Sequence, residues 1–326
     1  VDAAYDAVTG DNRNVVQVMT TGNRDFANPF HRPLYPYFNP EAEKNWIAVA
    51  GLQKDSATGG YKLVSTWNEA GLAKYWTVVA PGSGIYGSKV DTATGEPYWG
   101  NSSGTSMSAP HVTGAMTVLM SRYQDMSAVQ VRDVLFTTAN HKNPDGSNFA
   151  GWTAKEGEVD IRYGWGNPDL DKGMYGLGQL LGHFEYNMAT TDLDVWTNDI
   201  SQIALEQRES EERDWLAAAK AWQKLDDSKK LSMEGLTAEQ KELLGEILLD
   251  TDDDVVGVTA EQEKISEENA IAWRDQYYQK RIDAIQEKID KGLYDGSLTK
   301  RGQGTLVLTG NNDYLGETRV EGGTLL

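Results

Sequence analysis

Short apolar runs alternate with helix-like patterns through the first half of the chain. The runs, each bounded by turn residues, are VVQVMTTG, NWIAVAGLQ, KLVSTW and YWTVVAPG. Such runs are typical of buried strands, and the Ala-Thr-Gly turns at 57–60 and 93–96 indicate hairpins. Helical spacing of apolar residues follows at about 106–123 and again after Ser127, which stands at an N-cap position. This mixture predicts an α/β domain over residues 1–182.

A different pattern predicts an acidic α-helical insertion over residues 203–294, where glycine is scarce and charge is dense. Two apolar stripes recur there at helical spacing: Trp215, Ala219, Trp222 and Leu225, then Tyr278, Ile282, Ile285 and Ile289. Gly292 stands where a helix C′ residue is expected, and the stretches from Leu236 and Val258 each contain a Thr-x-x-Gln capping box. The stripes suit a helical hairpin or small bundle. From 295 to 326, β-branched residues alternate between Gly and Asn-Asn turns, which favours strands stacked in a solenoid.

Composition narrows the classes of partner. The formal net charge is −19, and more than half of this excess lies between residues 201 and 295. Nucleic acids and anionic membranes are bound by basic patches, so we expect neither as a partner. The chain has no cysteine, which excludes disulfides and thiolate metal sites. No stretch approaches the roughly 18 apolar residues of a membrane helix.

The sequence GTSMSAPHV, residues 104–112, indicates a nucleophilic serine. Ser106 follows a Gly-Thr turn that opens a helix, so free N–H groups and the positive end of the helix dipole face its oxygen. We place Pro110 in the first turn, where a missing N–H is tolerated. The G-x-S-x-G turn of α/β-hydrolases is absent, because Ser108 to Pro110 follow where the second glycine is required.

GTSMSAPHV followed by Gly114 closely resembles the nucleophile segment of the subtilisin-like serine proteases, the subtilases. VVQVMTTGN resembles the family strand that ends in an oxyanion-hole asparagine, which matches Asn23. VVAPGSGI and RYGWGNPDL resemble two further family segments, the latter near the helix that closes the catalytic domain. The resemblance implies a subtilisin-like parallel-sheet fold over 1–182, with Ser106 as nucleophile and Asn23 in the oxyanion hole.

The aspartate and histidine segments of that family precede its asparagine strand, and neither is found in this sequence. His111 belongs to the nucleophile motif, and the histidines in HRP, NHK and GHF do not resemble the family's base segment. The chain starts without methionine inside a helix pattern and stops inside a strand pattern. We therefore expect an incomplete catalytic domain, inactive alone, whose partner is the N-terminal part that carries the aspartate and histidine.

The tail from Leu298 resembles the repeat that opens the β-helical passenger of autotransporter proteins, and VWTNDIS at 195–201 resembles the strand leading into it. The resemblance implies connecting strands over 183–202, the helical insertion, and the first repeat of a right-handed β-helix over 295–326. It is typical of autotransporter serine proteases of Gram-negative bacteria. It implies peptide or protein substrates, an extracellular or cell-surface location, and an outer-membrane translocator barrel downstream.

One acidic loop is a candidate calcium site. Asp250, Asp252, Asp254 and Glu261 take positions 1, 3, 5 and 12 of an EF-hand loop, but Val255 replaces the glycine of its sharp turn. We expect an acidic turn before a helix, with no cofactor or metal required.

Two functions remain open from the sequence. The first is a serine endopeptidase acting through an acyl-enzyme on Ser106. The second is an inactive surface adhesin or scaffold that binds through the solenoid or the helical insertion.

Overall fold

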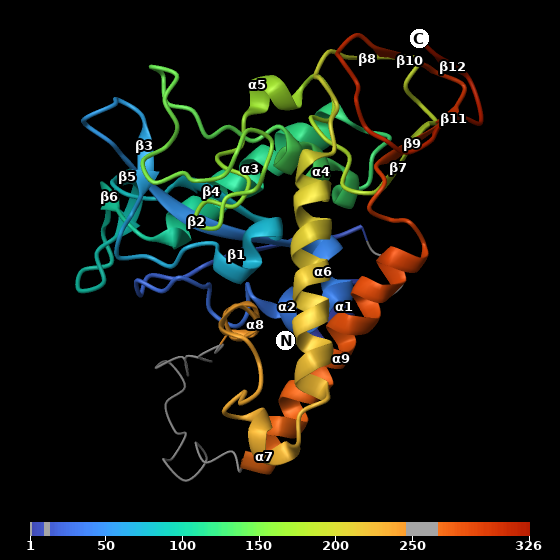
Figure 1. Cartoon of the computed structure of the whole chain (residues 1–326). Helices are drawn as coiled ribbons and strands as arrows, with labels where there is room; N and C mark the ends of the chain where they lie inside the picture. The colour runs from blue at the N-terminus through green and yellow to red at the C-terminus, as the bar shows by residue number, and fades with distance from the viewer. Residues whose placement is uncertain (1, 10–13, 246–266) are drawn as a thin grey trace.

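The computed structural model describes residues 2–9, 14–245 and 267–326 (Figure 1). A four-stranded sheet lies at the centre of the first half. Its strands are β1 (Gln17–Thr20), β2 (Trp46–Lys54), β3 (Tyr61–Leu63) and β4 (Thr77–Pro81). β1 and β4 pair in parallel with β2 on either side, and β3 pairs antiparallel with its last residues. β2 is buried over most of its length, whereas β1 is only half-buried.

Two helices cover this sheet. α3 (Thr105–Arg122) contacts β1, β2 and β4, and α4 (Ala128–Thr137) packs against α3. Val112 and Leu119 of α3 are buried in the same core as Ile47 and Val49 of β2. α4 begins with the expected N-cap, since the Ser127 hydroxyl accepts from the Gln130 N–H in a full capping box.

Shorter elements complete the domain. They are α1 (Asp2–Thr9), α2 (Tyr35–Phe38), α5 (Leu170–Gly173), the 3₁₀ helices η2 (Pro40–Asn45) and η3 (Gly71–Trp76), and the strands β5 (Ile85–Val90) and β6 (Pro97–Ser102). β2 with β3 and β5 with β6 form the two hairpins predicted from the Ala-Thr-Gly turns.

The helical segment is a long hairpin with two short helices beside it. α6 (Ile203–Gln223) packs against α9 (Glu267–Asp290), and the chain between them contains α7 (Asp227–Lys230) and α8 (Ala238–Leu244). Both predicted stripes lie at the contact, where the buried rings of Trp222 and Tyr278 meet edge to face at 4.9 Å. Thr237 caps α8 with Gln240 as predicted. The second predicted capping box, after Val258, lies outside the described residues.

Six strands form a parallel coil at the C-terminal end. They are β7 (His183–Met188), β8 (Leu193–Trp196), β9 (Ser297–Gly302), β10 (Thr305–Leu308), β11 (Thr318–Val320) and β12 (Thr324–Leu325). β7, β9 and β11 make one parallel sheet, and β8, β10 and β12 make another. The helical hairpin therefore interrupts a single β-coil between its first and second turns (Figure 1).

One local expectation, the position of Pro110, was wrong. α3 begins at Thr105, so Pro110 lies in its second turn and not its first. A proline there cannot donate to the carbonyl of Ser106, which loses its regular helical partner. The segment RYGWGNPDL is mostly turns and isolated bridges, and the helix after it is the single turn α5. Positive φ angles at Gly164 and Gly166 keep that segment out of a helix.

Candidate active site

The turn before α3 is held in an unusual conformation. Gly104 has φ +153°, which an L side chain rarely adopts, and its N–H donates to the Gly82 carbonyl at 3.0 Å. The Gly84 N–H donates to the Ser103 hydroxyl at 2.9 Å. These two bonds fix the turn against the chain leaving β4, and Ser106 is exposed in the first turn of α3.

Asn23 reaches this turn from the end of β1. Its Oδ1 accepts from the Thr105 N–H at 2.9 Å and from the Thr105 hydroxyl at 3.2 Å. Both partners are donors, so the amide oxygen must face Thr105 and the Nδ2 hydrogens must point elsewhere. Gly22 allows this approach. Its φ is +120°, and a Cβ there would lie 2.5 Å from the Phe30 ring.

The Asn23 amide and the Ser106 backbone nitrogen both lie near Gly104. A Cβ built on Gly104 would lie 3.7 Å from Asn23 Nδ2, 3.8 Å from Asn23 Oδ1 and 3.8 Å from the Ser106 backbone nitrogen. The Ser106 N–H is in the first turn of α3, where no intrahelical acceptor exists. The structure thus brings the two sequence-predicted residues, Asn23 and Ser106, to the same turn.

The four histidines all lie in described residues, and none of their described hydrogen bonds goes to Ser106. His111 Nδ1 bonds the Met107 carbonyl at 2.8 Å within α3. His183 Nδ1 contacts the Ser297 hydroxyl at 2.8 Å. His141 stacks on Trp152 with centroids 4.1 Å apart, and burial lowers its pKa.

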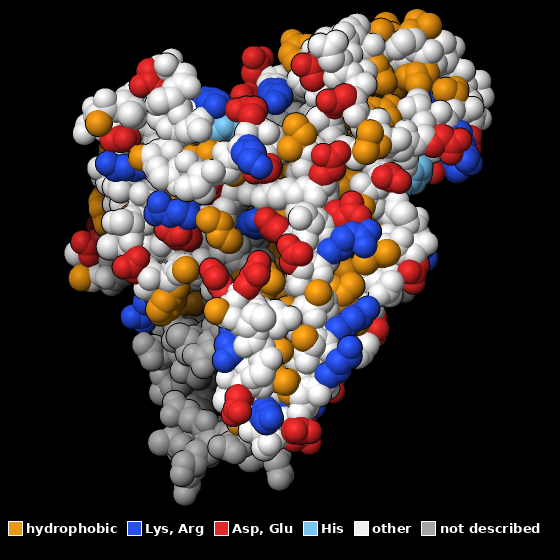
Figure 2. Space-filling model, in the orientation of Figure 1, with side chains coloured by type: hydrophobic (Ala, Val, Ile, Leu, Met, Phe, Trp, Pro, Cys, Tyr) orange, Lys and Arg blue, Asp and Glu red, His pale blue; other side chains and the backbone are white. Residues whose placement is uncertain are grey.

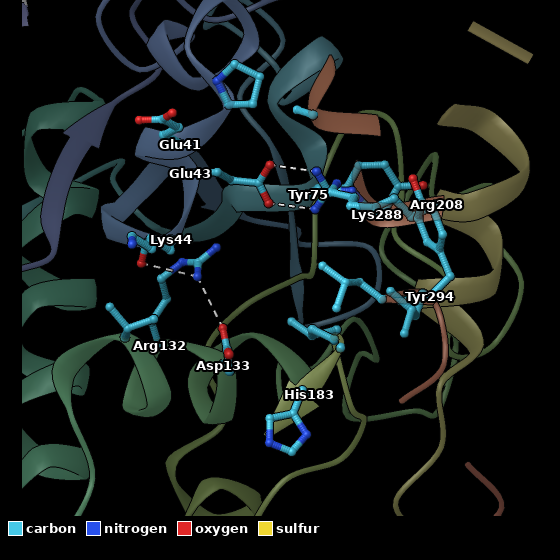
Figure 3. A pocket seen from close by; sticks show the side chains of 18 of the residues that line it. Glu41, Glu43, Lys44, Tyr75, Arg132, Asp133, His183, Arg208, Lys288 and Tyr294 are labelled. Carbon is cyan, nitrogen blue, oxygen red and sulfur yellow. Dashed lines mark hydrogen bonds and ion pairs between the residues drawn. The ribbon is translucent and has the colours of Figure 1, made fainter. Parts of the chain in front are cut away.

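A second cluster of charged residues, which the sequence did not predict as a unit, lies between the sheet domain and the helical hairpin (Figure 3). The carboxylate of Glu43 in η2 accepts a hydrogen bond from each of the two terminal nitrogens of Arg208, at 2.6 Å each. Arg208 Nε also donates to Glu212 at 2.8 Å, and Lys288 of α9 donates to the same carboxylate at 2.9 Å. The Tyr294 hydroxyl donates to it as well. Only the Arg208–Glu212 spacing on one helix face was visible in the sequence.

Burial and charge oppose each other at these groups. Burial favours the protonated form of Glu43, but the attraction of Arg208 outweighs it and lowers the pKa of Glu43 to about 2. The pKa of Glu212 is lowered by Arg208 and Lys288 against the same burial effect. Asp133 differs, since burial outweighs its pairing with Arg132 and raises the pKa of Asp133 to about 6.

The cluster borders a cavity of about 690 Å³. Its walls include Trp165 and Phe184 besides the charged groups, and no serine, threonine or cysteine is among the described residues that line it. Neither Ser106 nor Asn23 lines it. The cavity therefore belongs to the junction between the two parts of the chain and is separate from the candidate nucleophile.

No group of His, Asp and Glu side chains suited to hold a metal ion occurs in the part of the chain that the structure describes. The calcium candidates Asp250, Asp252, Asp254 and Glu261 lie outside the described residues. Nor is any helix among the described residues both long and apolar enough to span a bilayer.

The family model of the Subtilase family matches residues 1–166, more than half of the chain. The chain belongs to the subtilase family. A second model, the passenger-associated-transport-repeat, matches residues 298–326, which in this subtilase contain β10 to β12 and all but the first residue of β9. The fold class predicted from the sequence is confirmed: a subtilisin-like α/β domain followed by the start of a β-helix.

Three relatives of this subtilase are bacterial proteins. Serotype-specific antigen 1 of Mannheimia haemolytica is 32% identical over 192 residues, covering 58% of this chain and 19% of that protein. Extracellular serine protease of Serratia marcescens is 33% identical over 172 residues, covering 47% and 16%. Neisserial autotransporter lipoprotein NalP of Neisseria meningitidis serogroup B is 30% identical over 202 residues, covering 58% and 17%. The subtilase described here spans less than a fifth of the length of each.

Proposed function

We propose that this chain carries the nucleophile and the oxyanion donors of a serine endopeptidase. The observation that carries the proposal is the pair of hydrogen bonds that Thr105 donates to Asn23 Oδ1. These bonds turn the Asn23 amide hydrogens away from Thr105, and no described hydrogen bond uses them beside the Ser106 N–H. Ser106 attacks the peptide carbonyl, and the oxygen that becomes negative is received by these two donors. The amine leaves with a proton, and water then hydrolyses the acyl-enzyme.

The reaction requires a base for the Ser106 proton. We propose that this base and its aspartate come from outside these 326 residues, since no described hydrogen bond joins a histidine to Ser106. The 326 residues alone are then expected to give no appreciable peptide hydrolysis. Turnover by the purified chain, abolished by Ser106→Ala, would contradict this part of the proposal.

We also propose export to the cell surface by an autotransporter route. The proposal is supported by the match to the passenger repeat and by the parallel coil of β7 to β12, in which each turn stacks on the last. A membrane-impermeant amine reagent applied to intact cells should modify the full-length protein. Modification only after lysis would contradict export.

The nucleophile is tested by labelling the full-length protein with a fluorophosphonate probe. Labelling is expected on Ser106 and is lost in Ser106→Ala. Ser121→Ala is the matched control, because Ser121 is an exposed serine of the same helix whose hydroxyl only bonds the Val118 carbonyl. A full-length protein that stays unlabelled would favour the inactive surface scaffold instead.

A further inference from the structure

The hairpin of β5 and β6 presents an unpartnered aromatic face. Tyr86 and Trp99 are 67% and 68% exposed, and their rings stack with centroids 5.8 Å apart at 22°. Ser88 pairs with Trp99 and Tyr86 with Asn101, so these side chains share one face of the hairpin. We call this the hairpin face; its residues are Tyr86, Ser88, Val90, Pro97, Trp99 and Asn101, and all are exposed. Hydrophobic side chains are visible along that edge of the molecule in Figure 2.

No third strand pairs with the hairpin in the described part of the chain, where its sheet consists of β5 and β6. The turn is held by Asp91, whose Oδ1 accepts from the N–H groups of Ala93 and Thr94 at 2.8 and 3.0 Å. Gly95 completes the turn with φ +76°. On the other face, Lys89 donates to the Asn101 carbonyl at 2.7 Å and lies 5.9 Å from the Tyr98 ring. The aromatic pair is therefore displayed on a preorganised support.

Both ends of the hairpin are fixed to the turn before α3, in which Gly104 precedes Ser106. Ser103, Gly104 and Thr105 alone separate the end of β6 from Ser106. Across the base, the Gly104 N–H bonds the Gly82 carbonyl and the Gly84 N–H bonds the Ser103 hydroxyl. A molecule bound on the hairpin face is thus held at a fixed position relative to Ser106.

We propose that the hairpin face binds the substrate polypeptide away from the cleaved bond and selects a large apolar or aromatic side chain there. This inference rests on the proposed protease function. A strand rises about 3.3 Å per residue, so Trp99 lies about 10 Å along β6 from Ser102. An extended substrate from Ser106 reaches it about three to five residues from the cleaved bond. Exposed Tyr and Trp rings on a rigid support are suited to such contacts.

The net charge of the chain favours a substrate peptide on the hairpin face over a second copy of the chain or an anionic membrane. The net charge of −19 opposes close approach of a second copy of the chain and of an anionic membrane surface. A peptide segment with an apolar side chain meets no such repulsion. No third strand pairs with β5 or β6 among the described residues, so an extended peptide could bind along either strand.

The test compares two peptides with the full-length protein. They share the residues beside the cleaved bond, and the longer one adds a phenylalanine four residues away on each side. The double variant Tyr86→Ser/Trp99→Ser should lower kcat/KM for the long peptide by about five- to tenfold, through KM, and leave the short peptide unchanged. Trp99→Phe should retain most of the activity. Tyr175→Ser, at an exposed tyrosine outside the hairpin, is the matched control and should change kcat/KM for neither peptide.

Two further measurements distinguish the possible failures. Calorimetry should show the long peptide binding the Ser106→Ala protein. This binding should be lost when Tyr86→Ser and Trp99→Ser are introduced into the same protein. Fluorophosphonate labelling of Ser106 should be the same with and without the hairpin variants. Equal effects on both peptides, or none on either, would overturn the inference while intact labelling preserves the protease function.

If the double variant instead abolishes binding to anionic vesicles or changes the sedimentation coefficient, the face belongs to a lipid surface or a second copy. An unlabelled wild-type protein would refute the protease function, and calorimetry would still decide whether the face binds peptide.

Discussion

Glu43 and Arg208 face each other across the boundary between the subtilase domain and the helical insertion, with two bonds of 2.6 Å between them. Both side chains are largely removed from water, at 17% and 18% exposed. A parallel two-bond contact between a guanidinium and a carboxylate fixes direction as well as distance. The pair therefore sets how the insertion sits on the domain, together with the hydrogen bonds that Lys74 and Tyr75 donate to Glu211.

Removing one partner of this pair should lower the free energy of unfolding more than removing one partner of an exposed ion pair. Glu43→Gln leaves Arg208 with only Glu212, and we expect the free energy of unfolding to fall by about 3 kcal/mol in urea titrations. Glu209→Gln is the control. It breaks the exposed Arg213–Glu209 pair of the same helix and should cost about 0.5 kcal/mol or less. Equal effects from the two variants would show that the junction is not held by this pair.

The stability of the protein should fall in acid for the same reason. The pKa of Glu43 is about 2 in the folded chain against 4.5 for the free group. Between these values the unfolded chain binds more protons, so stability present above pH 4.5 is lost as the pH falls toward 2, by about 3 kcal/mol. Asp133 acts oppositely, since its raised pKa of about 6 favours folding as the pH falls from 6 toward 4. Urea midpoints measured from pH 7 to 2 should show the loss below 4.5, and Glu43→Gln should reduce it.

The oxyanion role of Asn23 predicts a specific kinetic loss. In the full-length protein, Asn23→Ala should lower kcat by about 10² to 10³ with little change in KM. Thr105→Val keeps the backbone N–H that holds Asn23 and removes only the hydroxyl at 3.2 Å, so a smaller loss is expected. Peptide hydrolysis by the two variants gives the comparison. A loss in KM alone for Asn23→Ala would contradict the role.

The β-coil predicts a contrast between two glycines with similar backbone angles. Gly302 has φ +73° and a Cβ there would lie 2.2 Å from the Met188 carbonyl, whereas Gly292 has φ +62° and open space around it. Gly292→Ala should cost about 1 kcal/mol from the backbone alone. Gly302→Ala should cost clearly more, because the first and second turns of the coil must separate. Thermal unfolding followed by circular dichroism measures both, and equal losses would contradict the predicted close packing.

The packing of the helical hairpin predicts a further contrast, between two tryptophans. Trp222 is fully buried against Tyr278, and its Nε1 donates to the Lys230 carbonyl at 2.9 Å. Trp222→Ala should therefore destabilise the protein by about 3 to 5 kcal/mol in urea. Trp99→Ala removes an exposed ring and should change stability by about 0.5 kcal/mol or less. A small effect at Trp222 would mean that the hairpin does not depend on its apolar stripe.

The features predicted correctly from the sequence have their causes within a few residues. A capping box at Ser127 needs only Gln130 three residues later, and the stripe around Trp222 needs only helical spacing. The resemblance to subtilases supplied the pairing of Ser106 with Asn23, which no local pattern contains.

The remaining features depend on distant contacts. Glu43 and Arg208 are separated by 165 residues, and nothing near either one predicts the other. The position of Pro110 was predicted wrongly by one turn, although the predicted helix start at about residue 106 is only one residue from the observed start at Thr105. The exposed stacking of Tyr86 on Trp99 became visible only when the strand register was known.

The interruption of the β-coil has a consequence for the order in which the protein can assemble. The first strand partner of β7 begins at Ser297, so the coil cannot start to close until the whole helical hairpin has been synthesised. Gln202 brings the two ends of that hairpin together, since its Oε1 accepts from the Gly296 N–H, 94 residues away, at 3.0 Å. Once α6 and α9 have packed, the entropy of closing so long a loop has already been lost. Packing of α6 against α9 therefore brings β7 and β9 together at a lower entropic cost.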